Sequence, residues 1–390
     1  MRPVYTIADN IITSLGFTTG ENLASIENGC TGLKKVIDPL LYPEPVILSR
    51  VDQIKLNVLF EELLAKYDKK TPAAFYTRLE KMFLLSVADV LYQSKADPRD
   101  KRMILVISST KGNIDLLEDR FKATFNHRRL YLWEMARIVA SFFEFKNPPV
   151  IISNACISGL VAIITAARMI GNSRFDQAIV AGGDIASEFV ISGFQSFQAL
   201  SPVNCRPFDR DRKGLSLGEG SGALLLTSSP DDTAHQPVLF SGGSVTNDAN
   251  HISGPSRTGE ELALAISRAM TSAGISPTEV DYISAHGTAT LYNDEMESKA
   301  LDINVLNKVP VNSYKGYWGH TLGAAGVIES VSSIASLRND RLYRSEGYEN
   351  PGISVPLNVL RYHESKKLTT CLKTASGFGG CNAAIVFQKS

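Results

Sequence analysis

A strand-to-helix junction at residues 149–159 decides the fold class, and it reads Pro149-Val-Ile-Ile-Ser-Asn-Ala-Cys156-Ile-Ser-Gly159. The β-branched run at its start is typical of a buried strand, and apolar residues continue on most faces of the following stretch. Gly171 and Asn172 then form a good helix C-terminus. We therefore predict a strand at 150–153 and a helix at 156–170, an arrangement that indicates an α/β fold.

The same alternation recurs along the rest of the chain. Short β-branched runs predict further buried strands at 103–107, 178–181, 223–226, 280–284 and 309–312. Helical spacing of apolar residues predicts helices at 260–273 and 321–337, and also near 59–64 and 79–91. Strands that alternate with helices favour mostly parallel sheets.

A polar stretch with two prolines, residues 228–237, is the clearest linker. It divides the chain into a first half, residues 1–235, and a second half, residues 236–390. The two halves share a local pattern. In the first half a predicted strand leads through Cys156 into a helix, and in the second half a predicted strand that begins near Pro310 leads through His320 into a helix. Ligands tend to bind where a strand leads into a helix in open α/β sheets, so a reactive group is expected there in each half.

Composition excludes several classes of partner. Lys and Arg number 40, as do Asp and Glu, so no overall charge favours nucleic acid or an anionic membrane. The five cysteines are odd in number and widely spaced, which favours a reducing compartment over disulfides or a zinc site. The N-terminus lacks an apolar signal-peptide region and the apolar runs are too short to span a bilayer, so we expect a cytoplasmic protein.

Cys156 is the first candidate for chemistry. A thiol at the first turn of a helix meets unpaired N–H groups and the positive end of the helix dipole. Such a site can lower the thiol pKa below its usual value of about 8.5 and so favour the nucleophilic thiolate. A buried structural cysteine is the alternative, because free cysteines are among the most buried residues.

Two histidines form the second candidate. His286 begins a His-Gly-Thr-Ala-Thr segment directly after a predicted strand, where its ring could act as a donor or a base. A histidine satisfied within a turn is the alternative. His320 follows Lys315 and precedes a helix of small residues that contains Glu329. Tight helix packing explains those small residues, but it does not explain a Lys and a His at the start of the helix.

The last candidate is the segment Ser376-Gly-Phe-Gly-Gly-Cys-Asn382, which lies between two predicted strands. A glycine-rich turn in this position can be an ordinary hairpin. Its N–H groups could also face a developing oxyanion.

Taken together, these segments resemble the β-ketoacyl synthases of the thiolase superfamily. That family uses a Cys, a His in a His-Gly-Thr segment, a second His in a Gly-His segment, and a Gly-Phe-Gly-Gly loop. Pro207-Phe-Asp209, the run from Gly218 to Gly220, and the opening stretch from Ile11 to Gly16 also match. The resemblance implies a thiolase-like fold, with two similar β/α halves stacked in five layers, α-β-α-β-α.

The resemblance also implies a reaction and a set of roles. The chain is expected to be an acyltransferase that condenses malonyl-(acyl carrier protein) with an acyl chain held on Cys156, in the synthesis of a fatty acid, a polyketide or an aryl polyene. The catalytic residues would be Cys156, His286, His320 and Lys315, and the oxyanion hole would be the N–H groups of Cys156 and Phe378. Substrate binding would fall to Thr288, Thr290, Phe378 and Gly379, with Glu329 and Asp294 in support. A plain ion pair between Lys315 and Glu329 is an equally sound interpretation of that pair.

No metal or cofactor of its own is expected, because phosphopantetheine arrives on the carrier protein. Such carriers are acidic, and a basic cluster of Lys122, Arg128 and Arg129 is one candidate docking surface, although such a cluster is more often a solvated helix face. The resemblance further implies a dimer paired through residues 150–153, formed by two copies or with a related synthase subunit.

Several departures from the family pattern affect the expected acyl pocket. They are Gly316-Tyr-Trp318, Leu291-Tyr-Asn293, Leu215 and Cys381. They favour a specialised pathway such as an aryl-polyene pigment. Two alternatives remain: a chain-length-factor-like subunit, although such subunits lack the nucleophilic Cys, and an acyl-CoA thiolase, although its final loop differs.

Overall fold

The structure is a computed structural model that describes residues 2–121, 124–230, 235–249 and 254–390. Its described residues form an 11-stranded sheet, which consists of two parts that meet along one short edge. The first part runs in the order β5 (Val150–Ile152), β4 (Met103–Ser108), β6 (Gln177–Asp184), β8 (Gly220–Thr227) and β1 (Tyr5–Ile12). The second runs in the order β13 (Asn358–Val359), β11 (Pro310–Asn312), β10 (Tyr282–Ser284), β15 (Thr370–Gly377), β16 (Cys381–Lys389) and β9 (Val238–Asn247).

The two parts repeat one topology. Numbered within each part by chain order, the strands from β5 to β1 and from β11 to β9 both run third, second, fourth, fifth, first. Within the described ranges, the two parts of the sheet are joined where Tyr5 and Thr6 of β1 pair with Leu239 and Val238 of β9. This repeat confirms the expectation of two similar halves. The division at residue 235 stays a prediction, because it falls in the connection between β8 and β9, beside residues outside the described part.

Mixed pairing corrects the prediction of mostly parallel sheets. The outer pairs, such as β4 with β5 and β10 with β11, are parallel. The inner pairs β6–β8, β1–β8, β15–β16 and β9–β16 are antiparallel. A physical reason is plain for β15 and β16: only residues 378–380 connect them, and so short a connection can join only antiparallel strands.

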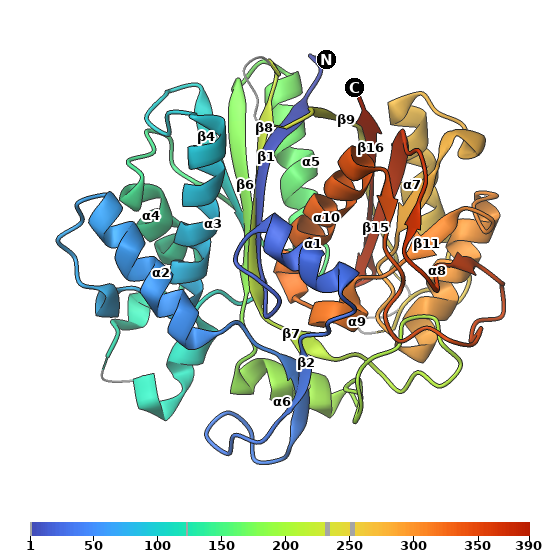
Figure 1. Cartoon of the computed structure of the whole chain (residues 1–390), viewed down its shortest axis with the longest axis horizontal. Coiled ribbons are helices and arrows are strands. Elements are labelled where there is room, and N and C mark those ends of the chain that lie inside the picture. Colours follow the sequence, from blue (N-terminus) through green and yellow to red (C-terminus); the bar gives the residue numbers. More distant parts are fainter. Residues whose placement is uncertain (1, 122–123, 231–234, 250–253) are drawn as a thin grey trace.

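The two parts of the large sheet form two separate layers, called the first and the second sheet below. Helices form three further layers around them (Figure 1). In the middle layer, α5 (Ser158–Gly171) and α10 (Ala325–Asn339) lie between the sheets. The first sheet is covered on its outer face by α2 (Gln53–Lys66), α3 (Arg78–Ser94) and α4 (Leu132–Phe142). The second is covered by α7 (Glu260–Ala273) and α8 (Leu291–Ile303). The five-layered α-β-α-β-α architecture is therefore confirmed.

Smaller elements complete the described part of the chain. They are α1 (Thr19–Glu27), β2 (Leu33–Val36), β3 (Val46–Ser49), α6 (Glu188–Ser196), β7 (Leu217–Gly218), α9 (Lys315–Trp318), β12 (Arg341–Leu342) and β14 (Glu364–Ser365). No helix among the described residues is long and apolar enough to cross a membrane.

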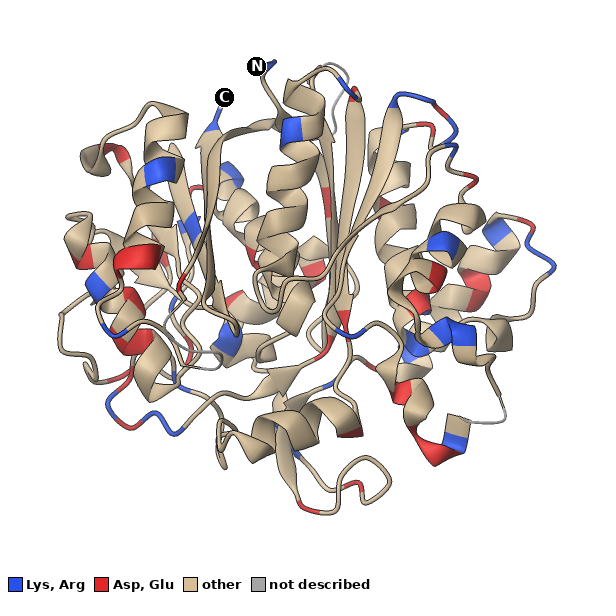
Figure 2. Ribbon diagram, turned by 180° about the vertical axis from the view of Figure 1, so that it is seen from behind, with Lys and Arg blue, Asp and Glu red and all other residues tan. Residues whose placement is uncertain are grey.

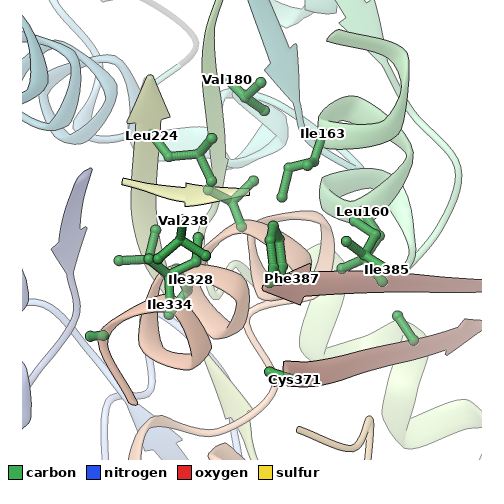
Figure 3. Packing of buried hydrophobic residues seen from close by; sticks show 14 of the residues in the cluster. Leu160, Ile163, Val180, Leu224, Val238, Ile328, Ile334, Cys371, Ile385 and Phe387 are labelled. Carbon is green, nitrogen blue, oxygen red and sulfur yellow. The ribbon is translucent and has the colours of Figure 1, made fainter. Parts of the chain in front are cut away.

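Side chains from both halves fill the space around the middle layer (Figure 3). Leu160 and Ile163 of α5 and Ile328 and Ile334 of α10 are fully or almost fully buried, together with Val180, Leu224, Ile385 and Phe387 from the two sheets. Burying one such side chain contributes about 1.5–3 kcal/mol. The apolar character of the middle helices on most faces follows from this position between two sheets.

Two glycines set how closely the middle helices approach. A Cβ on Gly159 would lie 2.6 Å from the main-chain nitrogen of Val327, and a Cβ on Gly326 would lie 2.5 Å from that of Leu160. No side chain fits at either position, so the first turns of α5 and α10 touch through their backbones. The segments that precede these helices, with Cys156 and His320, are therefore brought together.

Candidate active site

Cys156 lies in the tight turn between β5 and α5. Ala155 adopts a left-handed conformation with φ of 43°. Ser158 stabilises the turn, since its hydroxyl accepts from the N–H of Asn154 at 2.8 Å and donates to the carbonyl of Ala155 at 2.6 Å. The thiol is 8% exposed and lines a pocket. The predicted strand-to-helix junction thus places Cys156 at the surface of a cavity.

The prediction of a lowered thiol pKa is not supported. Helix α5 begins at Ser158, so Cys156 precedes the first turn instead of lying within it. Burial raises the pKa of the Cys156 thiol to about 12, aided by the neighbouring Cys381 and opposed by Lys315. The resting thiol is therefore protonated, and a nucleophilic attack must hand its proton to a neighbouring group.

His286 follows β10 in a turn that two carboxylates hold rigid. The carboxylate of Glu297 accepts from the N–H groups of His286 and Gly287, each at 2.8 Å. Asp294 accepts from the N–H groups of Thr288 at 2.9 Å and Ala289 at 3.2 Å. Both carboxylates belong to α8 and lie one turn apart on one of its faces. Asp294 and Glu297 thus each fix the turn through hydrogen bonds to its backbone, which fits the supporting role predicted for Asp294.

His320 precedes α10 and approaches His286 from the opposite side. Its N–H donates to the carbonyl of Ser216 at 2.7 Å, and its carbonyl accepts from Gly218 at 3.0 Å. The two imidazole rings lie 5.2 Å apart at an angle of 86°. Among the described residues, neither ring nitrogen of His320 has a hydrogen-bond partner. A buried, unpartnered ring is available to a substrate atom.

Both imidazoles are held in their neutral form. Burial lowers the pKa of His286 and of His320 well below the usual value, and the positive charge of Lys315 lowers both further. A neutral imidazole donates one N–H hydrogen bond without adding a fixed charge. The pair can therefore donate two hydrogen bonds to one oxygen of a bound substrate.

Lys315 lies beneath His286 in a buried charge cluster. Its ammonium lies 2.6 Å from the Glu329 carboxylate, 2.6 Å from the carbonyl of His286 and 3.3 Å from Nδ1 of the same residue. A second lysine of this cluster, Lys373, was not predicted; its ammonium lies 2.7 Å from the other oxygen of Glu329. The sequence did offer one indication of Lys373, since it is a single lysine within an otherwise uncharged run, residues 368–375.

The loop after β15 is a hairpin turn that also borders the site, so the hairpin interpretation of residues 376–382 is confirmed, whereas the oxyanion role of its N–H groups stays a prediction. Phe378 is 38% exposed and its ring lies 5.6 Å from that of Phe194 and 5.3 Å from that of Phe197. A Cβ on Gly377 would lie 3.0 Å from the main-chain nitrogen of Cys156, so the loop backbone packs directly against the nucleophile candidate. Gly379 is exposed and is not among the residues that line the pocket.

One pocket of about 440 Å³ collects these groups. Cys156, His286 and His320 line it, together with Thr288, Thr290 and Phe378. Much of its lining is apolar and includes Phe194, Phe197, Leu215, Leu291 and Tyr292. Of the departures that were expected to reshape the pocket, Leu215 and Tyr292 do line it. Trp318 does not, because it is fully buried and stacks on Tyr314 in the central core.

The expected basic docking cluster needs correction. Lys122 lies outside the described residues, and Arg128 is exposed. Arg129 is buried, because it forms an ion pair with Glu80 and packs on the rings of Phe75 and Phe125. Figure 2 shows both signs of charge interspersed over the outer helices and loops. At the pocket itself, the positive side chains are Arg212 and the exposed Lys213.

Comparison with known families agrees with this geometry. The model of the β-ketoacyl synthase N-terminal domain matches residues 19–232, and that of the C-terminal domain matches residues 239–349. The chain belongs to the β-ketoacyl synthase family. This β-ketoacyl synthase is similar to curated proteins from several bacteria. It is 32% identical to 3-oxoacyl-[acyl-carrier-protein] synthase 2 of Coxiella burnetii over 266 residues, which cover 65% of this chain and 64% of that protein.

Two further similarities are informative. The synthase is 32% identical to a putative polyketide β-ketoacyl synthase 1 of Streptomyces halstedii, over 67% of this chain and 65% of that protein. The chain thus spans just under two thirds of the length of these curated relatives. Among solved structures, a chain of the complex of a ketosynthase (ApeO) with its chain length factor (ApeC) from Xenorhabdus doucetiae is 26% identical. It superposes with a TM-score of 0.87 over 100% of this chain and 98% of that chain.

Proposed function

We propose that this β-ketoacyl synthase is a 3-oxoacyl-(acyl carrier protein) synthase that extends acyl chains by decarboxylative condensation. The observation that carries the proposal is the meeting of Cys156 with two buried, neutral histidines on one pocket. The names of its curated relatives, 3-oxoacyl-[acyl-carrier-protein] synthase and polyketide β-ketoacyl synthase, support the same reaction class.

In the first step, Sγ of Cys156 attacks the carbonyl carbon of an acyl thioester. The new C–S bond forms, the old one breaks, and the thiol proton passes through a neutral histidine to the departing phosphopantetheine sulfur. The N–H groups of Cys156 and Phe378 serve as the oxyanion hole. One such donor is worth about 3–4 kcal/mol of the barrier.

In the second step, malonyl on the carrier protein loses carbon dioxide. The electron pair of the broken C–C bond becomes an enolate, whose oxygen accepts hydrogen bonds from His286 and His320. The enolate carbon then attacks the acyl group on Cys156, so that a C–C bond forms and the C–S bond breaks. The cysteine thiolate takes up a proton from solvent, and the product is a β-ketoacyl chain longer by two carbons.

The remaining groups position these residues. Lys315 and Glu329 orient His286 through the contacts described above. Asp294 fixes the turn that carries Thr288. Thr288 and Thr290, whose hydroxyls lie 2.9 Å apart on the pocket wall, bind the pantetheine arm, and Phe378 with Gly379 gates the acyl chain. No metal or cofactor of the synthase itself takes part in this scheme.

The partners belong to the same proposal. An acidic carrier protein docks at the pocket mouth, where the exposed Lys213 lies. The synthase acts as a dimer through β5, which is the last strand of the sheet and has half-buried side chains. The partner subunit is a second copy or a related synthase subunit, and the cytoplasm is the compartment, since all five cysteines are free. A chain-length-factor-like role is less well supported, because Cys156 and both histidines are present.

The test is a condensation assay with acyl- and malonyl-(acyl carrier protein), in which released carbon dioxide and the β-ketoacyl product are both measured. Saturated, polyenoyl and aryl acyl groups are offered in parallel, so that the preferred chain identifies the pathway. His286→Ala and His320→Ala should each release less carbon dioxide while still accepting the acyl group on Cys156. A folded wild-type protein that forms no product from any acyl group, alone or with a related subunit, would refute the proposal.

A further inference from the structure

Lys373 is a lysine in the protein interior, where burial of a charged group is energetically unfavourable. It lies in the middle of β15, between β10 and β16, and its side chain is fully buried. Transfer of an ammonium from water to the protein interior costs several kcal/mol unless charges and hydrogen bonds compensate it. The condensation scheme above gives Lys373 no role, so its presence needs another explanation.

Four oxygen atoms surround the Lys373 ammonium. It donates to the carbonyls of Ser284 and Ala285, each at 3.2 Å, and to that of Thr374 at 2.8 Å. One carboxylate oxygen of Glu329 completes the set at 2.7 Å. A neutral amine has two N–H donors and a lone pair that oxygen atoms would repel, whereas an ammonium has three donors and no acceptor. These contacts and the Glu329 charge favour the ammonium form, although burial lowers the pKa of Lys373.

Two of these carbonyls belong to the segment that carries His286. Ser284 ends β10, and Ala285 directly precedes the histidine. Thr374 adds a second connection, because its hydroxyl donates to Glu297 at 2.6 Å and Glu297 accepts from the N–H of His286. Lys373 and its neighbour thus hold the backbone of His286 from the strand side, while Lys315 holds it from the α9 side.

Two ammonium groups and two carboxylates meet beside the backbone of His286. Glu329 lies between Lys315 and Lys373, each of which contacts one of its oxygens. Glu297 is the second carboxylate of the cluster. Removal of Lys373 would leave one negative charge uncompensated beneath the histidines. Other titratable and charged groups border the site: Cys156, Cys381 of β16 and Asp184 of β6, whose charges act on Cys156, and Asp294 of α8, which pairs with Arg212.

We propose that Lys373 is a positioning residue of the condensing site: its ammonium fixes the backbone that carries His286 and balances Glu329, so that the histidine pair stays neutral and oriented. This inference rests on the proposed function. It adds a residue that touches neither the substrate nor the thiol and acts through His286 and Glu329.

The charge effect has a definite sign. The positive charge of Lys373 contributes to the low pKa of both His286 and His320, after burial and Lys315. Lys373→Met keeps the length of the side chain and removes its charge, so the pKa of both histidines rises toward its usual value of about 6.5 while burial and Lys315 still hold it below that value. The protonated imidazole then appears at higher pH, and the acidic limb of the condensation profile moves to higher pH.

The test compares wild type, Lys373→Met, and the double variant Lys373→Met/Glu329→Gln, in which the loss of one negative charge restores the balance. NMR of the histidine ring carbons, assigned with His286→Ala and His320→Ala, follows protonation from about pH 8 down to the pH at which the protein unfolds, because the pKa of both histidines lies below the ordinary value of about 6.5. We expect the pKa of at least one of the two histidines to rise by about one pH unit in the single variant and to return toward wild type in the double variant. The condensation profile should follow the same order.

Lys389→Met is the matched control, because it removes a lysine of the adjacent strand β16 that pairs with Asp340. It should leave both histidine titrations unchanged. Unchanged titrations in Lys373→Met would overturn the proposal, as would unfolding of both the single and the double variant, since that result means a purely structural role. A wild type without condensing activity but with the expected titration shifts would refute the proposed function alone.

Discussion

The ammonium of Lys315 lies 2.6 Å from the carboxylate of Glu329, and both side chains are only 1% exposed. A buried pair of this kind contributes little net stability by itself, because desolvation offsets the attraction between the charges. Loss of one partner is costly, since it leaves the other charge buried and unpaired. The pair therefore serves to hold His286, and its removal should affect both folding and catalysis.

Glu329→Ala should lower the free energy of unfolding by about 3–5 kcal/mol, because it exposes Lys315 and Lys373 to one another without a counter-charge. Urea denaturation followed by circular dichroism measures the change. Lys70→Ala is the control, since Lys70 pairs with Asp68 at a highly exposed site and should cost less than about 1 kcal/mol. Equal effects of the two substitutions would contradict a buried, functional cluster.

The contact between α5 and α10 can be tested at Gly159. A methyl group there would meet backbone atoms of α10 at 2.6 Å, and backbone cannot give way as a flexible side chain can. Gly159→Ala should therefore destabilise the fold by about 1–3 kcal/mol and slow acylation of Cys156. Gly193→Ala in α6 is the matched control: its Cβ would meet nothing within 4 Å, so alanine should stabilise the protein by about 0.5–1 kcal/mol. Similar melting temperatures for both variants would argue against this contact.

The neutral histidines make stability depend on pH below neutrality. Burial holds the pKa of His286 and of His320 well below the value of about 6.5 in the unfolded chain. As the pH falls below that value, the unfolded chain binds protons that the folded one does not, so stability decreases by up to about 1.4 kcal/mol per pH unit and histidine. Denaturation of wild type and of His286→Asn/His320→Asn across this range should show a shallower slope in the variant. Parallel slopes would mean that the histidines are not buried in neutral form.

The proposed dimer edge can be tested at Ile151. The carbonyl of Ile152 accepts from Ser109 on the β4 side. Alternate residues of a parallel strand point their main-chain groups in opposite directions, so the groups of Ile151 face outward. Ile151→Pro removes the outward N–H and should yield a monomer in light scattering, whereas Ile151→Ala keeps it and should remain dimeric. The same mass for both variants would place the interface elsewhere.

Much of the fold could be predicted because local patterns specify it. The predicted helix at 260–273 coincides with α7, and each predicted strand overlaps an observed one. Strand direction was mispredicted, since it depends on how the connections run in space. For example, the apolar residues of β15 and β16 are compatible with parallel or antiparallel pairing, and the short hairpin between the strands makes the pairing antiparallel.

Within the site, motifs identified the residues of the pocket but not their electrostatics. Cys156, His286 and His320 do share one cavity. The thiol pKa was expected in the wrong direction, because the burial of Cys156 results from packing against distant parts of the chain, such as the backbone at Gly377. Lys373 and Arg129 were misjudged for the same reason: the partners that allow their burial, Glu329 and Glu80, belong to other elements.

The central claim is that Cys156 accepts the acyl chain, and intact-protein mass spectrometry tests it most directly. Wild type, Cys156→Ala and Cys381→Ala are each incubated with a panel of acyl-(acyl carrier protein) thioesters. We expect an acyl mass gain on wild type and on Cys381→Ala, and none on Cys156→Ala. An acyl gain that persists in Cys156→Ala, or that disappears only in Cys381→Ala, would contradict the account.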